Sequence, residues 1–279
     1  MNALVTGASG FIGRTLMRTL ADAGHQATPW RRGTPLDLDC VDTVFHLAAP
    51  VDPRRDADLG RMLEGIVLLS DRVAMACLEA DVRLVHVGTC EEYGDGPAPF
   101  VEDQPPQPVS PYSTAKAAAT MRALALHRAH GLRVTVARPF LTYGPGQRGD
   151  RLIPTALRAA LAGQVFPMTT GHQTREVNYV DDIARGLLAC ADDAAIGRIL
   201  NIGGGPELPV IELVQRIFAT AGADPGLIQA GALPTRSGET PRFVGNHQRA
   251  RQVLGHRPEV SLDQGLRRTM EACRSASSP

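Results

Sequence analysis

A tyrosine and a lysine four residues apart, Tyr112 and Lys116 in SPYSTAKAAAT (110–120), are the residues whose types and spacing could do chemistry. Ser110 and Pro111 are typical of the N-cap and first turn of a helix, so the pair would share one helical face, one turn apart. A phenol has a pKa of about 10 and is a poor acid or base at neutral pH unless a nearby cation stabilises its anion. The spacing therefore predicts a tyrosine acid–base assisted by a lysine.

Lys116 is also the only lysine in a chain that carries 29 Lys and Arg residues, so the other 28 are arginines. A lysine ammonium is compact and can bond a ribose hydroxyl, whereas the planar guanidinium of arginine is larger and does not place a point charge. A lysine that survived by chance on a solvated helix is the plain alternative. The position four residues after a tyrosine favours a functional lysine.

A glycine-rich turn lies close to the N-terminus. VTGASGFIG (5–13) places Gly7, Gly10 and Gly13 at G-x-x-G-x-x-G spacing, after an apolar strand and before a helix. Glycine at these points allows a tight turn, close approach of the backbone to a pyrophosphate, and close helix–strand packing. The alternative is an ordinary glycine-rich turn, but the strand–turn–helix context favours a dinucleotide site with phosphates at the helix N-terminus.

Two arginines follow the second predicted strand and bear on the choice of cofactor. Arg31 and Arg32 end the run PWRRG, at the place where an acid would bind the ribose 2′-hydroxyl of NAD. An arginine there accommodates the 2′-phosphate of NADP instead. Two solvated surface arginines in an arginine-rich chain are the alternative. We expect NADP(H) to be the cofactor.

Short β-rich runs alternate with longer helical stretches beginning near Gly13, Gly60 and Ser110, a pattern typical of a parallel sheet covered on both faces. The second crossover is short, and LDLD (36–39) is expected to be all that is left of a third strand. The sequence thus predicts an α/β fold, a Rossmann-like doubly wound parallel sheet with a smaller α/β C-terminal substrate lobe. The expected strands are 3–7, 26–30, 43–49, 83–89, 132–139 and 198–204.

We expect two lobes with chain crossing between them. Residues 1–150 would form the dinucleotide-binding domain, 176–205 would return to it, and 151–279 would mainly form the substrate-binding lobe. Helices are expected in the second half near 151–162, 181–191, 209–221 and 261–273.

Composition excludes several classes of protein. Acidic and basic residues balance at 29 each, so no basic excess indicates binding to nucleic acid or a membrane surface. No stretch approaches the roughly 20 apolar residues of a membrane span, and no signal-peptide pattern opens the chain. The five scattered cysteines contain no C-x-x-C pair, and the eight histidines form no metal-ligand spacing. We expect a cytoplasmic protein with reduced thiols and no metal.

Several segments together resemble the extended short-chain dehydrogenase/reductase family. The resemblance is closest to the branch that acts on nucleotide sugars, which includes epimerases, dehydratases, decarboxylases and 4-ketoreductases. It covers nearly the whole chain. The segments that carry it are VTGASGFIG, VFHLAA, VGTCEEYG, PYSTAK, RPFLTYGPGQ, REVNYVDDIARG and ILNIGGG.

The resemblance implies a set of site residues. The catalytic residues would be Thr89, Tyr112 and Lys116, with Thr89 bonding the substrate oxygen beside Tyr112. The cofactor would contact Gly7, Gly10, Phe11, Ile12, Gly13, Arg31, Arg32, Asp37, Leu38, Leu47, Ala48, Ala49, Tyr112, Lys116 and Pro139. The nucleotide sugar would contact Thr89, Glu91, Tyr112, Leu141, Arg175 and Arg242. For Ala48 and Ala49 strand-end packing is the alternative, and for Arg175 and Arg242 it is an ordinary surface arginine.

Departures from the family pattern narrow the chemistry. The 4,6-dehydratases carry Thr-Asp-Glu where this chain has Thr89-Cys90-Glu91, so the acid that protonates the departing 6-hydroxyl is missing. A thiol with a pKa of about 8.5 is a poor substitute. The role of Glu91 stays open between a substrate ligand, a base for epimerisation and a surface acid. Leu141 and Thr142 stand where many relatives have an asparagine, which removes a usual sugar–phosphate contact.

These observations favour an NADPH-dependent reductase of a 4-keto nucleotide sugar, with Tyr112 as proton donor. The alternative enzyme is a nucleotide-sugar epimerase or dehydratase that recycles a bound cofactor. A cofactor-binding regulator without turnover is a different class, and the Thr89, Tyr112 and Lys116 set argues against it. The family further implies a homodimer through helices near 60–80 and 110–130.

Overall fold

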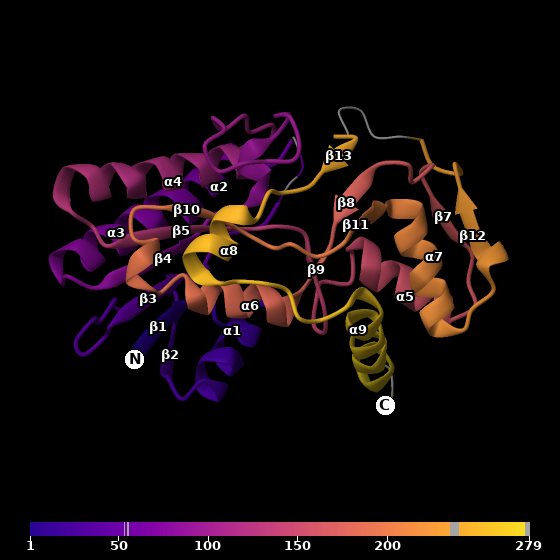
Figure 1. Cartoon of the computed structure of the whole chain (residues 1–279), viewed down its shortest axis with the longest axis horizontal. Helices are drawn as coiled ribbons and strands as arrows, with labels where there is room; N and C mark the ends of the chain where they lie inside the picture. Colours follow the sequence, from indigo (N-terminus) through magenta and orange to yellow (C-terminus); the bar gives the residue numbers. More distant parts are fainter. Residues whose placement is uncertain (53, 55, 235–239, 277–279) are drawn as a thin grey trace.

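Six parallel strands form the central sheet of the chain (Figure 1), in the order β10-β5-β4-β3-β1-β2. The computed structural model describes residues 1–52, 54, 56–234 and 240–276. Hydrogen-bonded registers join each neighbouring pair in parallel, as a doubly wound fold requires. The strands are β1 (Asn2–Thr6), β2 (Gln26–Trp30), β3 (Thr43–His46), β4 (Arg83–Val87), β5 (Val134–Pro139) and β10 (Ile199–Ile202).

Helices cover both faces of this sheet because side chains alternate along each strand. Val5 belongs to the core on one face, together with Leu16 and Ile183, whereas the neighbouring Leu4 belongs to the core on the other face, with Val73. The predicted α/β class with a covered parallel sheet is therefore confirmed. The covering helices are α1 (Phe11–Asp22) and α6 (Val180–Ala189) on the first face, and α3 (Leu69–Glu79) and α4 (Pro111–His130) on the second.

The prediction of a strand remnant at 36–39 is wrong. The sheet ends at β2, and the chain from there to β3 crosses in turns. Asp37 accepts a hydrogen bond from the backbone N–H of Asp39 at 3.0 Å, which bends the segment. Leu36 and Leu38 are only half-buried against the core, so the segment follows the surface and forms no strand.

A second, smaller lobe follows β5 and is built around three helices. Its core includes Leu157, Phe218 and Leu266, one from each helix. The helices are α5 (Leu152–Leu161), α7 (Val210–Ala221) and α9 (Leu262–Ala276). Short strands surround them: β6 (Thr142–Tyr143), β7 (Phe166–Met168), β8 (Thr174–Glu176), β9 (Asn178–Tyr179), β11 (Glu207–Pro209), β12 (Ile228–Ala230) and β13 (Arg242–Phe243).

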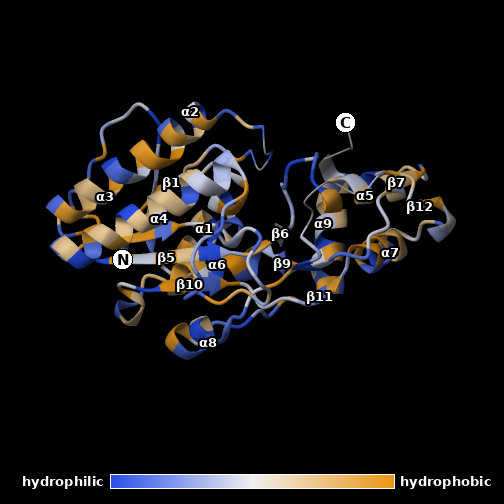
Figure 2. Cartoon of the chain, turned by 90° about the horizontal axis from the view of Figure 1, so that it is seen from above, coloured by the Kyte–Doolittle hydropathy of each residue, from blue (hydrophilic) through white to orange (hydrophobic). Residues whose placement is uncertain are grey.

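The chain crosses between the two lobes, with β6 and β9 lying between them in Figure 2. After β8, α6 packs in the core of the first lobe and β10 joins the six-stranded sheet. A later segment also returns, because α8 (Gln248–Leu254) places Ala250 in the first-lobe core. The buried carboxylate of Glu176 helps to hold this crossing through a contact with His247 at 2.8 Å.

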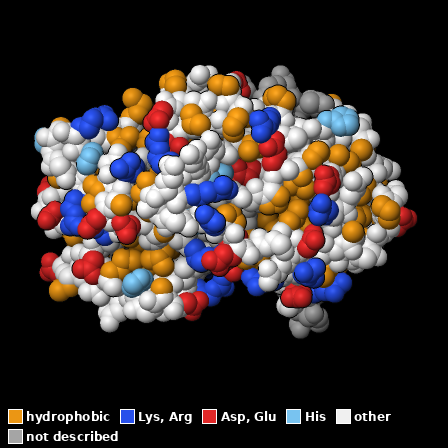
Figure 3. All heavy atoms as spheres, viewed as in Figure 1, with side chains coloured by type: hydrophobic (Ala, Val, Ile, Leu, Met, Phe, Trp, Pro, Cys, Tyr) orange, Lys and Arg blue, Asp and Glu red, His pale blue; other side chains and the backbone are white. Residues whose placement is uncertain are grey.

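Shorter helical turns complete the fold, and the surface is mixed in charge. Positive and negative side chains intermingle over the face drawn in Figure 3, as the balanced composition suggests. Within the described ranges, no helix has the length and apolar character needed to cross a membrane. The short turns are α2 (Leu59–Met62), the π-helical η1 (Leu63–Leu68), and the 3-10 turns η2 (Cys90–Tyr93), η3 (Asp193–Ala195) and η4 (Pro225–Leu227).

Candidate active site

The glycine-rich turn packs directly against the end of β3. Gly7 has a φ of +72°, and a Cβ there would lie 2.8 Å from the backbone N of Ala48. A Cβ at Gly13 would lie 2.1 Å from the carbonyl oxygen of Gly7, so neither position tolerates a larger residue. Gly10 is the N-cap of α1 and has no side-chain capping bond. No N-cap side chain bonds the first N–H groups of α1, so they remain available to an anion, a geometry that suits a phosphate.

The three predicted catalytic residues come together where β4 ends. Thr89 is the N-cap of η2, just beyond β4, while Tyr112 and Lys116 lie one turn apart near the start of α4. Ser110 accepts a hydrogen bond from the backbone N of Ser113 at 3.1 Å and so caps this helix, as expected. Thr89, Tyr112 and Lys116 are all at least 93% buried within the chain. The structure therefore brings together residues from two separate segments.

The electrostatics of this cluster differ from the expectation for Tyr112. Burial raises the pKa of the Tyr112 phenol, the negative charge of Glu91 raises it further, and a hydrogen bond with Thr89 opposes both. Burial also lowers the pKa of Lys116 to about 8. The expected lowering of the Tyr112 pKa by Lys116 is not found, because the ammonium is turned to the backbone carbonyl of Val87 at 2.7 Å. The phenol is a protonated group at neutral pH.

Cys90 and Glu91 follow Thr89 and complete this corner of the site. Burial raises the pKa of the Cys90 thiol well above its usual value, so Cys90 is neutral and weakly acidic. Burial likewise raises the pKa of Glu91, an effect that the positive charge of Arg151 partly offsets. Arg151 is the N-cap of α5 in the second lobe, so the corner faces the junction between the lobes.

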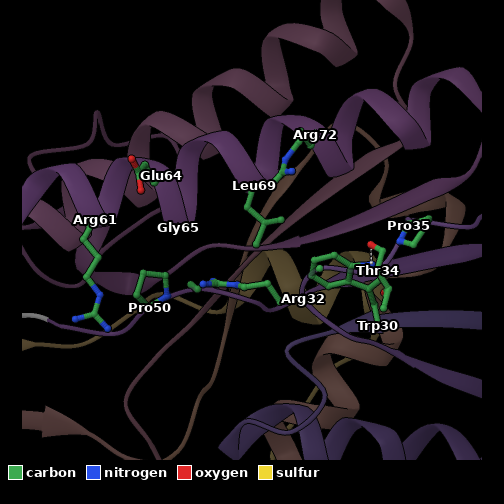
Figure 4. Close-up of a pocket in the computed structure, with 12 residues that line it drawn as sticks. Trp30, Arg32, Thr34, Pro35, Pro50, Arg61, Glu64, Gly65, Leu69 and Arg72 are labelled. Carbon is green, nitrogen blue, oxygen red and sulfur yellow. Dashed lines mark hydrogen bonds between the residues drawn. The ribbon is translucent and has the colours of Figure 1, made fainter.

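A pocket of about 680 Å³ opens beside the ends of β2 and β3. Arg32 lies across it between Pro50 and Trp30, with the helices that carry Arg61 and Arg72 above (Figure 4). Arg31 is exposed and is not among the lining residues, so only one of the two predicted arginines reaches the pocket. The residues that line it are Trp30, Arg32, Gly33, Thr34, Pro35, Ala49, Pro50, Arg61, Glu64, Gly65, Leu69 and Arg72.

Sequence reasoning missed Arg61 and Arg72. Among the described residues, no hydrogen bond or ion pair holds either guanidinium, nor that of Arg32. The available signal was their spacing, since Arg61, Gly65, Leu69 and Arg72 recur at the interval of one helical face. Gly65 lets η1 approach the loop after β3, because a Cβ there would lie 2.8 Å from Pro50.

The predicted substrate arginines lie in the second lobe on neighbouring strands. Arg175 on β8 donates to the backbone carbonyls of Thr174 and Thr240 at 2.8 and 2.9 Å. Arg242 on β13 forms an ion pair with Glu207 at 2.7 Å, so its charge is already partly neutralised.

The remaining predicted contacts lie where the strands approach the site. Phe11 and Ile12 begin α1, Leu47 and Ala48 follow β3, and all four are half-buried. Asp37 is exposed and Leu38 half-buried in the crossover after β2. Pro139 ends β5 and is buried, whereas the side chain of Leu141 is 38% exposed. In the described part of the chain, no group of three or more His, Cys, Asp or Glu residues could hold a metal ion.

A doubly wound sheet with a glycine-rich turn before α1 and a buried Thr–Tyr–Lys cluster is typical of nicotinamide-dependent oxidoreductases of the extended short-chain dehydrogenase/reductase type. Residues 3–203 match the model of the NAD dependent epimerase/dehydratase family, and the chain belongs to this family. The resemblance noted in the sequence is thereby confirmed.

Relatives within the family carry different activities. The chain is 33% identical to a dTDP-glucose 4,6-dehydratase of Streptomyces griseus, over 96% of this chain and 92% of the relative. It is 30% identical to a GDP-6-deoxy-D-mannose reductase of Pseudomonas aeruginosa, over 94% of each chain. Among solved structures it is similar to DesIV, a dTDP-glucose 4,6-dehydratase of Streptomyces venezuelae with NAD and TYD bound, at a TM-score of 0.85. The identity to DesIV is 30%, over 99% of this chain and 97% of that one.

Proposed function

We propose that the protein uses NADPH to reduce a nucleotide sugar that carries a 4-keto group on a deoxy sugar. NADPH would supply a hydride to the keto carbon, and the phenol of Tyr112 would donate a proton to the carbonyl oxygen. Thr89 would bond that oxygen, and Lys116 would hold the ribose. The products are the oxidised cofactor and a sugar alcohol, with the phenolate reprotonated from solvent.

The observation that carries the proposal is the arginine-lined pocket at the end of β2. Arg32, Arg61 and Arg72 all line a space where a dinucleotide bound over the glycine turn would place its adenosine ribose. Each charge-assisted hydrogen bond to a phosphate contributes about 1.5–3 kcal/mol. Selection of a 2′-phosphate suits an enzyme that consumes reduced cofactor from the NADP pool. An enzyme that regenerates its cofactor in each cycle gains nothing obvious from that selection.

The state of Tyr112 also supports reduction. Its raised pKa keeps the proton on the phenol at neutral pH, ready for an oxygen that becomes an alkoxide as hydride arrives. Burial lowers the pKa of Lys116 to about 8, so the ammonium is still mostly charged at neutral pH and can bond a ribose hydroxyl. A buried phenol that keeps its proton fits the proton-donor role that the reductase proposal assigns to Tyr112.

A second candidate is an epimerase or dehydratase that recycles a bound cofactor. The curated relatives support it, since the Streptomyces griseus dehydratase is more similar to this chain than the Pseudomonas aeruginosa reductase is. Glu91, with its raised pKa, could act as a base on the sugar. Cys90 argues against dehydration, because a buried thiol with a raised pKa is poorly suited to protonate a departing hydroxyl.

The second lobe would bind the nucleotide diphosphate, with Arg175 and Arg242 as its cationic ligands. Arg242 would exchange its contact with Glu207 for the phosphate, and Arg175 lies one strand away. We also propose a homodimer in the cytoplasm. Large apolar side chains on α2, η1 and α4 are 40–61% exposed and would be covered by a second copy: Leu59, Leu63, Leu68 and Met121.

Incubation with NADPH and a panel of 4-keto-6-deoxy nucleotide sugars tests the proposal. Cofactor oxidation with a product heavier by two hydrogens supports the reductase. A nucleotide hexose that loses water without added reductant would support the dehydratase instead, and isomerisation without change of mass would support the epimerase. Cofactor binding with no turnover of any sugar would favour a regulator.

A further inference from the structure

The carboxylate of Glu92 lies fully buried behind Thr89 and contacts three separate segments. One oxygen, Oε1, accepts hydrogen bonds from the backbone N of Thr89 at 2.9 Å and from the hydroxyl of Thr120 at 3.2 Å. The other, Oε2, accepts from the Nε and Nη2 of Arg138 at 3.0 and 2.8 Å. Glu92 and Arg138 are 0% and 1% exposed, so this is an ion pair without solvent.

The partners of Glu92 connect it to every predicted catalytic residue. Thr120 lies on α4 one turn after Lys116, and hence on the helix that carries Tyr112. Arg138 lies on β5, next to β4, at whose end Thr89 begins η2. A single carboxylate therefore joins the turn that presents the Thr89 hydroxyl to the helix that presents the phenol and the ammonium.

A buried ion pair at this position carries a large desolvation cost. Apolar side chains of similar volume are often neutral or stabilising in such positions. Nη1 of Arg138 has no hydrogen-bond partner among the described residues, which adds to the cost. The fit around the carboxylate is also close, since a Cβ at Gly88 would lie 2.4 Å from Oε1. Core packing alone does not require charges here.

We propose that Glu92 is a positioning residue for the reaction: it fixes Thr89 relative to Tyr112 and Lys116, and it acts as the buried counter-charge of Lys116. This inference rests on the proposed function for the reaction it serves. Glu92 does not touch the reacting atoms. It acts through the backbone of Thr89 and through its charge.

Other titratable groups also face Lys116. His46 on β3 and His86 on β4 are both buried, and burial keeps both imidazoles neutral by lowering their pKa values. The negative charge of Glu91 raises the pKa of Tyr112, which lies on the same helix as Lys116. Glu92 is the group whose charge raises the pKa of Lys116 against the lowering by burial. Removal of that charge should move the Lys116 pKa further down.

The single lysine allows a direct measurement without substrate. Selective ¹³Cε-lysine labelling gives one side-chain NMR resonance, which reports the titration of Lys116 alone. In Glu92→Gln the shape is kept and the charge is lost, so the Lys116 midpoint should fall by about one pH unit. A purely structural role for Glu92 would leave the midpoint unchanged.

A second variant separates the link to α4 from the ion pair. Thr120→Val removes one hydrogen bond to Glu92 and keeps the pair with Arg138. We expect kcat to fall about tenfold, because Thr89 would be less well aligned with Tyr112. The KM for NADPH should be unchanged. Thr114→Val is the matched control, because Thr114 is exposed on the same helix and contacts neither Glu92 nor the site.

An unshifted Lys116 midpoint in Glu92→Gln would overturn the inference, as would equal kinetics in Thr120→Val and Thr114→Val. Where Glu92→Gln does not fold, Thr120→Val decides alone. The lysine titration needs no substrate. A failure of every keto sugar tested would therefore reject the proposed function, and the titration would still decide the role of Glu92.

Discussion

The ammonium of Lys116 donates a hydrogen bond to the backbone carbonyl of Val87 at 2.7 Å, which fastens α4 to the last residue of β4. Thr89 follows two residues after Val87, so this contact also sets the distance between the helix and the predicted catalytic hydroxyl. Lys116 is only 4% exposed. The structure thus gives a physical reason for a lone lysine in an arginine-rich chain, because a compact cation is enclosed between helix and sheet.

Lys116→Arg should lower both stability and turnover. The larger guanidinium must enter a packed space, and overpacking costs about 1–3 kcal/mol. It would also leave its charge in a different place from the ammonium, which should weaken cofactor binding. Thermal unfolding and a cofactor titration test this, with Arg128→Lys on the exposed side of α4 as the control. Wild-type behaviour of Lys116→Arg would refute the explanation of the lone lysine.

Tyr112→Phe should reduce turnover by about 10²–10⁴-fold, the usual contribution of a positioned proton donor. Cofactor affinity should stay close to that of the wild type, since the ring and its packing against Met62 and Ile66 are kept. Steady-state kinetics and a binding titration measure the two effects. Tyr143→Phe is a control, because that hydroxyl bonds Leu262 in the second lobe. Substantial activity in Tyr112→Phe would assign proton donation to another group.

NADPH should bind at least ~10-fold tighter than NADH, which corresponds to one charge-assisted bond. The sequence alone suggested Arg31 and Arg32 equally, but only Arg32 lines the pocket. Arg32→Ala, Arg61→Ala and Arg72→Ala should each reduce the preference while changing NADH affinity little.

Two further variants sharpen the cofactor test. Arg31→Ala should behave nearly as wild type because Arg31 lies outside the pocket lining, and Glu64→Gln should bind NADPH more tightly because it removes a negative charge from that lining. Equal affinities for NADPH and NADH in the wild type would count against both the NADP(H) assignment and the reductase.

Stability should fall as the pH drops below about 6.5, the pKa of a histidine in an unfolded chain. Burial lowers the pKa of His46 to about 3 and that of His86 well below its usual value, so both are neutral when folded. The unfolded chain binds the extra protons in this range. The stabilisation from each buried neutral histidine is therefore fully present above the unfolded-state pKa. It is lost as the pH falls toward the folded-state pKa, at about 1.4 kcal/mol per pH unit for each histidine.

His86→Leu should reduce that slope, because it removes an imidazole whose two nitrogens have no partner among the described residues. Urea unfolding at several pH values between about 7.5 and 5 measures the slope. His130→Gln at the exposed end of α4 is the control. A slope in His86→Leu equal to that of the wild type would mean that His86 is not buried as a neutral group.

Local features could be predicted from the sequence because their causes are local. Ser110 and Pro111 start α4 through the capping and dihedral preferences of neighbouring residues, and this places Tyr112 and Lys116 on one face. The spacing of the N-terminal glycines likewise follows from a turn only a few residues long. The parallel strands were visible as apolar runs between helices.

Only the tertiary structure determined which residues far apart in the sequence contact one another. Glu92 and Arg138 are 46 residues apart, and Arg32 joins Arg61 and Arg72 in one pocket only because β2 ends beside η1. The pKa of Tyr112 depends on burial and on Glu91, which no spacing along the helix reveals. Desolvation and contact between distant segments are properties of the folded packing. The residue pattern therefore singled out Tyr112 and Lys116 but not the electrostatics around them.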